Sequence, residues 1–136
     1  MQLNPYLFFN GNCQEAFEFY EECLGGKIAM KFLNENAPPE GQMTEMPGEK
    51  IMHIRLEVGD WVLMGGDCPP QMFEESKGFC VNLAIDNPAE AERIFHLLAE
   101  NGTVQMPIQQ TFWAFRFGTV TDRFGIPWMV NCEKES

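Results

Sequence analysis

The stretch GFCVNLAIDNPAEAERIFHLLAENG, residues 78–102, contains the clearest pairing of a strand with a helix in this sequence. Residues 78–86 are mostly apolar and β-prone, which predicts a strand. Asn87 and Pro88 suit the N-cap and the first position of a helix, because Asn accepts from free amides and Pro lacks one. Gly102 ends the helix, whose apolar stripe recurs at helical spacing and comprises Ala91, Ile94, Phe95 and Leu98.

Three more strands are predicted after this helix, at residues 103–108, 112–120 and 126–131. The last two are separated by a turn that begins at Asp122, whose carboxylate we expect to cap it. The second half of the chain is therefore predicted to run strand, helix and three strands.

The first half of the chain predicts the same order. Residues 4–10 form an aromatic strand, and a helix follows, with Asn12 as its N-cap and Glu15 completing a capping box. The strands predicted after that helix cover residues 27–33, 50–58 and 61–65. A loop at 34–49 and a linker at 66–77 complete this half.

A βαβββ unit repeated once indicates an α+β protein with two modules, about 1–66 and about 78–133, in a single domain covering residues 1–136. One helix cannot cover both faces of a four-stranded sheet. We therefore expect the mixed sheets to join and curl into a cup whose concave face carries no helix. Such a face is a ready pocket.

Composition narrows the classes of partner. The chain has 136 residues, 45% of them apolar, and its formal charge of −11 repels nucleic acid and anionic membranes. No apolar run is long enough to span a bilayer, and the start MQLNPYLFF lacks the basic region of a signal peptide. The five cysteines have no CxxC spacing, which favours free thiols. We expect a cytoplasmic protein that binds neither nucleic acid nor membranes.

The repeat resembles the vicinal oxygen chelate superfamily, which includes glyoxalase I, bleomycin-resistance proteins and extradiol dioxygenases. The segments NPYLFFNGNCQEAFEFYEECLGG, MHIRLEVGDWVLMGGD and QQTFWAFRFGTVTDRFGIPWMVN are similar to its PhnB-like branch, and the likeness spans nearly the whole chain. It implies the glyoxalase-like fold, a homodimer and a small-molecule ligand. Some members carry a methyltransferase label, but nothing here resembles a glycine-rich nucleotide site.

The resemblance also implies a divalent metal held by His, Gln or Glu from the first and last strands of each module. None of those residue types occupies the candidate positions, which are Pro5, Tyr6, Leu7, Leu63, Met64, Cys80 and Met129. Thioether, thiol and aliphatic groups bind hard ions poorly. We therefore predict no metal site and no cofactor.

The predicted ligand site has two polar anchors, His53 and Arg55, which share one face of the 50–58 strand. Its apolar walls are predicted to be Tyr6, Phe8, Trp113, Phe115 and Trp128. Each prediction has a structural alternative. His53 could be a half-buried histidine, Arg55 and Arg116 could pair with Glu57, Asp60 or Asp122, and the aromatic rings could belong to the core or to a dimer interface.

The sequence is compatible with three functions. We favour a metal-free protein that binds a small molecule as a homodimer. The alternative is a metal-dependent lyase, isomerase or dioxygenase, in which the ion polarises vicinal oxygens of the substrate. A purely structural module is the third, and a Cys80 nucleophile with His53 as its base is a minor variant. The sequence does not identify the ligand.

Overall fold

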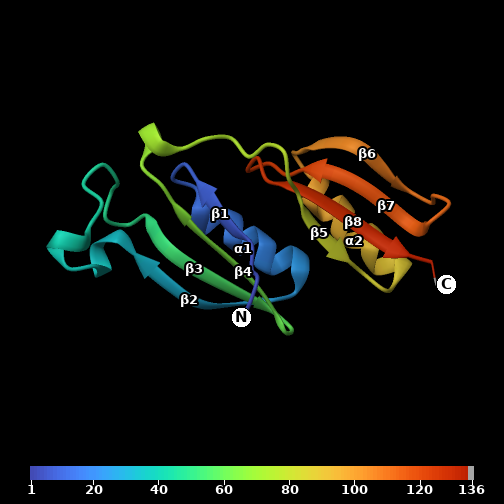
Figure 1. Cartoon of the computed structure of the whole chain (residues 1–136), viewed down its shortest axis with the longest axis horizontal. Coiled ribbons are helices and arrows are strands. Elements are labelled where there is room, and N and C mark those ends of the chain that lie inside the picture. The colour runs from blue at the N-terminus through green and yellow to red at the C-terminus, as the bar shows by residue number, and fades with distance from the viewer. Residues whose placement is uncertain (135–136) are drawn as a thin grey trace. The chain divides into compact units, whose positions relative to one another are not determined.

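The computed structural model describes residues 1–134, which divide into two compact units (Figure 1). The first unit is Met1–Glu74, and the second begins at Glu75. Each unit contains one α-helix and one four-stranded sheet. The predicted α+β class and the repeated order of strand, helix and three strands are confirmed.

The sheet of the first unit has the strand order β1-β4-β3-β2. β1 pairs parallel with β4, and the other two pairings are antiparallel. The elements of this unit are β1 (Tyr6–Phe9), α1 (Cys13–Leu24), β2 (Lys27–Leu33), β3 (Ile51–Val58) and β4 (Trp61–Asp67).

The sheet of the second unit has the equivalent order β5-β8-β7-β6, again with one parallel pairing, between β5 and β8. Its elements are β5 (Val81–Ala84), α2 (Pro88–Ala99), β6 (Thr103–Gln109), β7 (Ala114–Thr121) and β8 (Pro127–Glu133). The same topology in both units confirms the internal repeat.

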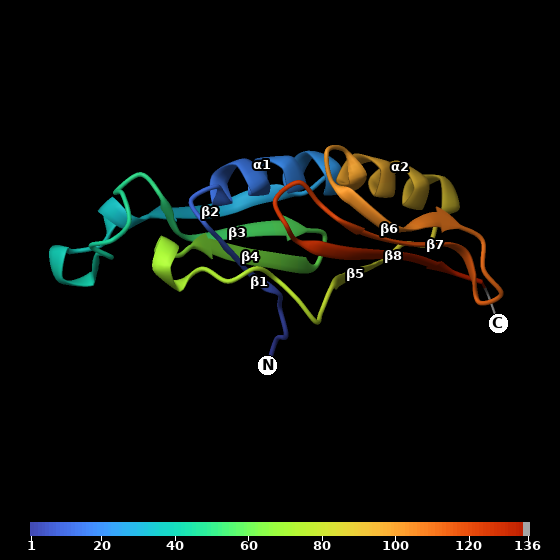
Figure 2. The same ribbon diagram turned by 90° about the horizontal axis from the view of Figure 1, so that it is seen from above.

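Each helix lies along one face of its own sheet (Figure 2). In the first unit, Phe17 and Tyr20 of α1 are fully buried, as are Ile54 and Leu56 of β3. In the second unit, Phe95 and Leu98 of α2 are buried in the same way. The other face of each sheet carries no helix within its unit, so its side chains are available for another role.

The two helices begin differently, although both have Asn at the N-cap. The Asn87 side chain accepts from the backbone N–H of Glu90 at 3.1 Å, as predicted. Asn12 makes no such bond, and the predicted capping box is wrong. Asp67 takes its place, because its carboxylate accepts from the N–H groups of Gly11 and Cys13, both at 3.0 Å.

Two strands depart from strict alternation. Ile51 was predicted to share a face with His53, yet its side chain is buried, and the pairing of β2 with β3 shifts register beside it. Trp113 precedes β7, and the register of β7 shifts between Ala114 and Arg116. Such bulges re-aim side chains, so faces assigned by parity alone fail there.

Candidate functional site

The helix-free face of the first sheet, which we call face 1, carries side chains from all four strands. One row across it consists of cross-strand partners: Tyr6 of β1 lies opposite Met64, Met64 opposite Arg55, and Arg55 opposite Met30. Partners in register project on the same side of a sheet. Arg55 lies between the fully buried Ile54 and Leu56, so its side chain projects away from α1.

A second row of face 1 lies beside the first. Phe8 is opposite Gly66, and His53 is opposite Phe32. The rings of Tyr6 and Phe8 lie 5.1 Å apart, and Tyr6 stacks on His53 at 5.5 Å with an angle of 24° between the planes. The part of face 1 formed by these two rows is therefore an aromatic and thioether surface that contains Arg55. The next pair along β3 on the same face is Glu57 with Lys27.

Gly66 of β4 lies beneath the Tyr6 side chain, between β1 and β3. A Cβ atom at this position would lie 2.7 Å from the Met52 carbonyl oxygen and 3.0 Å from the Tyr6 hydroxyl. Only glycine therefore allows the Tyr6 phenol to cross β4 and reach β3. Gly66 was predicted to be the first residue of the linker at 66–77, but it belongs to β4.

Tyr6 and His53 form a polar pair at this crossing. The Tyr6 hydroxyl donates to the Met52 carbonyl at 3.4 Å, and His53 Nδ1 lies 3.2 Å from the same hydroxyl oxygen. Burial, and to a smaller extent the nearby Cys13, raises the pKa of Tyr6. In one tautomer of His53, Nδ1–H donates to the Tyr6 hydroxyl; in the other, the hydroxyl donates to Nδ1.

Arg55 forms no ion pair with any residue in the described part of the chain. The predicted partners Glu57 and Asp60 lie near it in sequence, but the ion pairs of residues 1–134 involve other cations. The predicted structural pairing of Arg55 is therefore wrong. Arg55 is half-buried and its cross-strand neighbours are methionines, so its charge lacks the compensation that burial of charge requires.

We expect Gly66→Ala to lower the free energy of unfolding by about 1–3 kcal/mol, because a methyl group is forced against backbone. It should also separate Tyr6 from His53. Urea denaturation measures the first effect, and the His53 ring resonances measure the second. Gly59→Ala is the control for adding a methyl group, since nothing lies within 4 Å of a Cβ there, although its φ of +59° adds backbone strain. Equal His53 resonances in wild type and Gly66→Ala would contradict the geometry.

Four of the seven predicted site residues, Tyr6, Phe8, His53 and Arg55, come together on face 1. The other three belong to the second unit. Trp113 and Phe115 are about two-fifths exposed, at 42% and 40%. Trp128 is in the core of its unit at 1% exposure, and its indole N–H donates to Asp122 at 2.8 Å. Trp128 is therefore a core residue of the second unit and not a wall of face 1.

The helix-free face of the second sheet has a different chemistry. Asn82, Met129 and Thr119 are partners across three of its strands. Beside them, Asn131 pairs with Ala84 and Phe117, and its side-chain Oδ1 is buried without a hydrogen-bond partner among the described residues. This face therefore lacks the Tyr-His-Arg combination of face 1.

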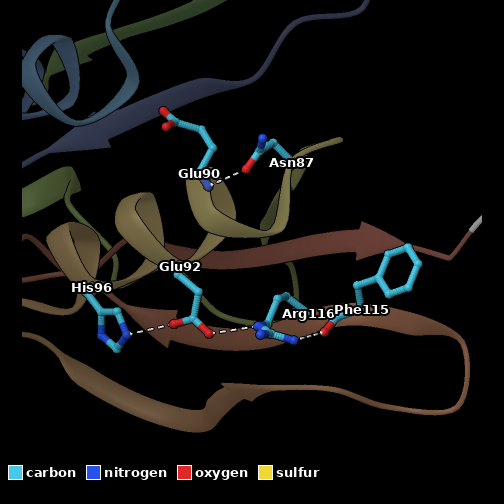
Figure 3. A network of polar contacts seen from close by, with 6 residues as sticks. All are labelled: Asn87, Glu90, Glu92, His96, Phe115 and Arg116. Carbon is cyan, nitrogen blue, oxygen red and sulfur yellow. Dashed lines mark hydrogen bonds and ion pairs between the residues drawn. The ribbon is translucent and has the colours of Figure 1, made fainter.

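Arg116 lies on the helix side of the second sheet, where it joins a polar network (Figure 3). Its Nε donates to Glu92 at 2.8 Å, and the other Glu92 oxygen lies 3.0 Å from His96 Nε2. Arg116 therefore forms an ion pair, as one of the structural alternatives predicted, but its partner is Glu92 of α2 and not Glu57, Asp60 or Asp122. The side chain of His96 is 67% exposed and lies on the surface of α2.

All five cysteines are free thiols. Cys13, Cys23 and Cys132 are buried, Cys68 is half-buried and Cys80 is exposed. Burial, with a smaller contribution from Asp67, raises the pKa of Cys13, which keeps that thiol protonated and unreactive.

The residues of face 1 do not fit the divalent metal that the superfamily resemblance implies. His53 and Glu57 are the side chains of face 1 of types that commonly bind such ions, and they lie four residues apart on β3 with Arg55 between them on that face. Within residues 1–134, no three His, Cys, Asp or Glu side chains gather closely enough to hold an ion. None of the helices described there is long and apolar enough to cross a membrane.

Repeated βαβββ units with open sheet faces define the glyoxalase/bleomycin-resistance/dioxygenase fold. An enzyme of that class from Burkholderia phytofirmans PsJN superposes with a TM-score of 0.64 at 13% identity, covering 96% of this chain and 97% of that one. The family model described as 3-demethylubiquinone-9 3-methyltransferase matches residues 1–131. The chain belongs to this family, the PhnB-like branch of the superfamily.

Two further proteins are more similar in sequence. Protein YjdN of Escherichia coli (strain K12) is 35% identical over 143 residues, which cover 99% of this chain and 97% of YjdN. Protein PA1353 from Pseudomonas aeruginosa is 47% identical, and its crystal structure superposes with a TM-score of 0.88 over 99% of both chains. Neither name states an activity.

Proposed function

We propose that the protein binds a small organic molecule on face 1 without a metal ion. The single observation that carries this proposal is Arg55, a half-buried arginine with no ion pair in the described chain, whose cross-strand neighbours on face 1 are Met30 and Met64. A protein that needed Arg55 only for stability would be expected to pair it.

The arrangement offers three kinds of contact to a ligand. Tyr6 and Phe8 present ring surface for stacking or apolar contact. Arg55 supplies N–H donors in a fixed planar fork. His53 supplies Nε2 as a second polar contact, and the Nδ1 contact with Tyr6 holds the ring in orientation. A few polar groups within an apolar surface are typical of small-molecule sites.

The binding test uses four probes of similar size and different charge: phenol, benzamide, benzoate and benzylamine. We expect at least one of them to shift the amide resonances of Tyr6, Phe8 and His53 in ¹⁵N-labelled protein. Phe8→Ala should weaken that binding, because it removes ring surface. Trp61→Ala is the matched control, since Trp61 is 80% exposed at the hairpin end of β4. The proposal fails if none of the four probes shifts these resonances.

The second candidate is a metal-dependent lyase, isomerase or dioxygenase, and membership of the superfamily favours it. The two functions are distinguished by metal analysis of protein purified without chelators. We expect less than stoichiometric metal, because the donor groups of face 1 are unsuited to hard ions. A stoichiometric transition metal that His53→Ala removes would establish the enzyme instead.

We also propose that the protein is a homodimer. The support is apolar surface outside face 1: Phe112, Trp113 and Phe115 are exposed in and beside the start of β7. Exposed aromatic rings are enriched in the interfaces of proteins. Sedimentation equilibrium should give twice the chain mass of 15.6 kDa. A mass equal to one chain at micromolar concentration would contradict the dimer.

A further inference from the structure

We infer that the ligand of face 1 is a small planar organic anion, an aromatic carboxylate whose carboxylate group pairs with Arg55 while its ring lies against the Tyr6–His53 pair. This inference rests on the proposed function and adds the chemical class of the ligand. It follows from the charge of face 1, from the shape of the guanidinium and from the position of the rings.

The charge of face 1 is unusual for this chain. The sequence carries twenty acidic and only nine basic side chains, so a cation without a carboxylate partner is unexpected. The positions of face 1 around Arg55 are Tyr6, Met64, Met30, Phe8, Gly66, Phe32 and His53, and none of these is acidic. Glu57, the next residue of β3 on the same face, forms no ion pair with Arg55 in the described chain. A cationic ligand would meet Arg55 with like charge, and a neutral one would leave it unpaired. An anion removes both costs.

The shape of the cation favours a carboxylate. A guanidinium presents parallel N–H donors that match the two oxygens of a carboxylate, which gives two charge-assisted hydrogen bonds at once. Such bonds are about twice as strong as neutral ones. Other cations of the described chain do not offer this: Arg116, for example, already donates to Glu92 and to the Phe115 carbonyl.

The positions of the aromatic rings on face 1 favour an aromatic group in the ligand. His53 and Arg55 are two residues apart on β3, so their Cα atoms are separated by about 7 Å along the strand. That distance suits an anion at Arg55 and a ring beside His53. Tyr6 is stacked on His53 at 5.5 Å and lies beside Phe8 at 5.1 Å. Because the Tyr6 phenol crosses above Gly66, the ligand ring is placed on the outer surface of Tyr6 and Phe8, which are 36% and 58% exposed.

The experiment compares benzoate with benzamide, its neutral isostere, and with acetate, which lacks the ring. Each is titrated into ¹⁵N-labelled full-length protein, and the dissociation constant is taken from the shifts of Tyr6, His53 and Arg55. We expect benzoate to bind about 10-fold or more tightly than benzamide, the factor that one charge-assisted hydrogen bond supplies. Acetate should bind more weakly than benzoate.

Variants identify the anchor. Arg55→Gln should remove the preference for benzoate, because it weakens benzoate binding far more than benzamide binding. Arg55→Lys should keep part of the preference, because a lysine retains the charge without the fork. Arg116→Gln is the matched control and should leave both affinities unchanged. Thermal denaturation of each variant confirms that it is folded.

Equal affinities for benzoate and benzamide, or an unchanged preference in Arg55→Gln, would overturn the inference while the binding function stands. Acetate binding as tightly as benzoate would overturn the aromatic part of it. If none of these compounds, nor phenol or benzylamine, shifts the resonances of face 1, the proposed function itself fails.

Discussion

Asp67→Ala is expected to lower the free energy of unfolding by about 3 kcal/mol, a loss typical of a buried charged group that several partners share. The Asp67 carboxylate is 4% exposed and accepts from three backbone N–H groups: Gly11 and Cys13 at 3.0 Å, and Ile51 at 2.9 Å. It therefore ties the start of α1 and the end of β4 to the start of β3. Removing it leaves these buried donors unsatisfied.

Urea denaturation of the full chain measures this effect, and two variants sharpen it. Asp67→Asn should lose less, because its amide oxygen still accepts while its NH₂ group opposes one of the donors. Asn12→Ala is the matched control, and we expect a change within about 0.5 kcal/mol, since the Asn12 side chain makes no capping bond. A larger loss in Asn12→Ala than in Asp67→Ala would reverse the assignment of the cap.

Asp122→Ala is expected to have the second large effect, a loss of about 2–4 kcal/mol. Its carboxylate is 3% exposed and accepts from the N–H groups of Phe124 at 2.8 Å and Ile126 at 3.0 Å, as well as from the Trp128 indole. The predicted turn cap at Asp122 is thereby confirmed. The same side chain also fixes the orientation of the largest buried ring in the second unit.

The individual bonds of Asp122 can be separated. Trp128→Phe removes the indole donor and retains most of the ring, so it should lose less than Asp122→Ala. Asp60→Ala tests the equivalent hairpin of the first unit, where the aspartate is exposed, and we expect almost no change. Denaturation curves that coincide for Asp122→Ala and Asp60→Ala would show that the buried hydrogen bonds contribute nothing.

The sequence predicted some elements of this structure correctly and others incorrectly. The helix starting at Pro88 was predicted from Asn87, Pro88 and the apolar spacing, and α2 covers Pro88–Ala99. Local patterns of this kind are enough to predict a helix, because the cap, the first turn and the buried stripe all lie within a few residues of one another. The repeat of strand, helix and three strands follows from the same local signals in both halves.

The end of β4 was predicted incorrectly for a physical reason. The predicted strand stopped at residue 65, whereas β4 continues through Gly66 and Asp67. Glycine and aspartate disfavour strands when considered alone. Here the extension pairs with β1, and the backbone contacts that require glycine and aspartate come from residues far away in the sequence.

The candidate site divides in the same way. His53 and Arg55 were identified from alternation within a single strand, and the aromatic character of Tyr6 and Phe8 was plain from their run. The sequence alone thus determined the fold class, the repeat and the residue types of the site. Only the tertiary structure decided that Tyr6 reaches His53 across Gly66, that Arg55 has no partner in the described chain, and that Asp67 caps α1. Those outcomes depend on the register between strands distant in sequence, which side-chain periodicity along one strand does not encode.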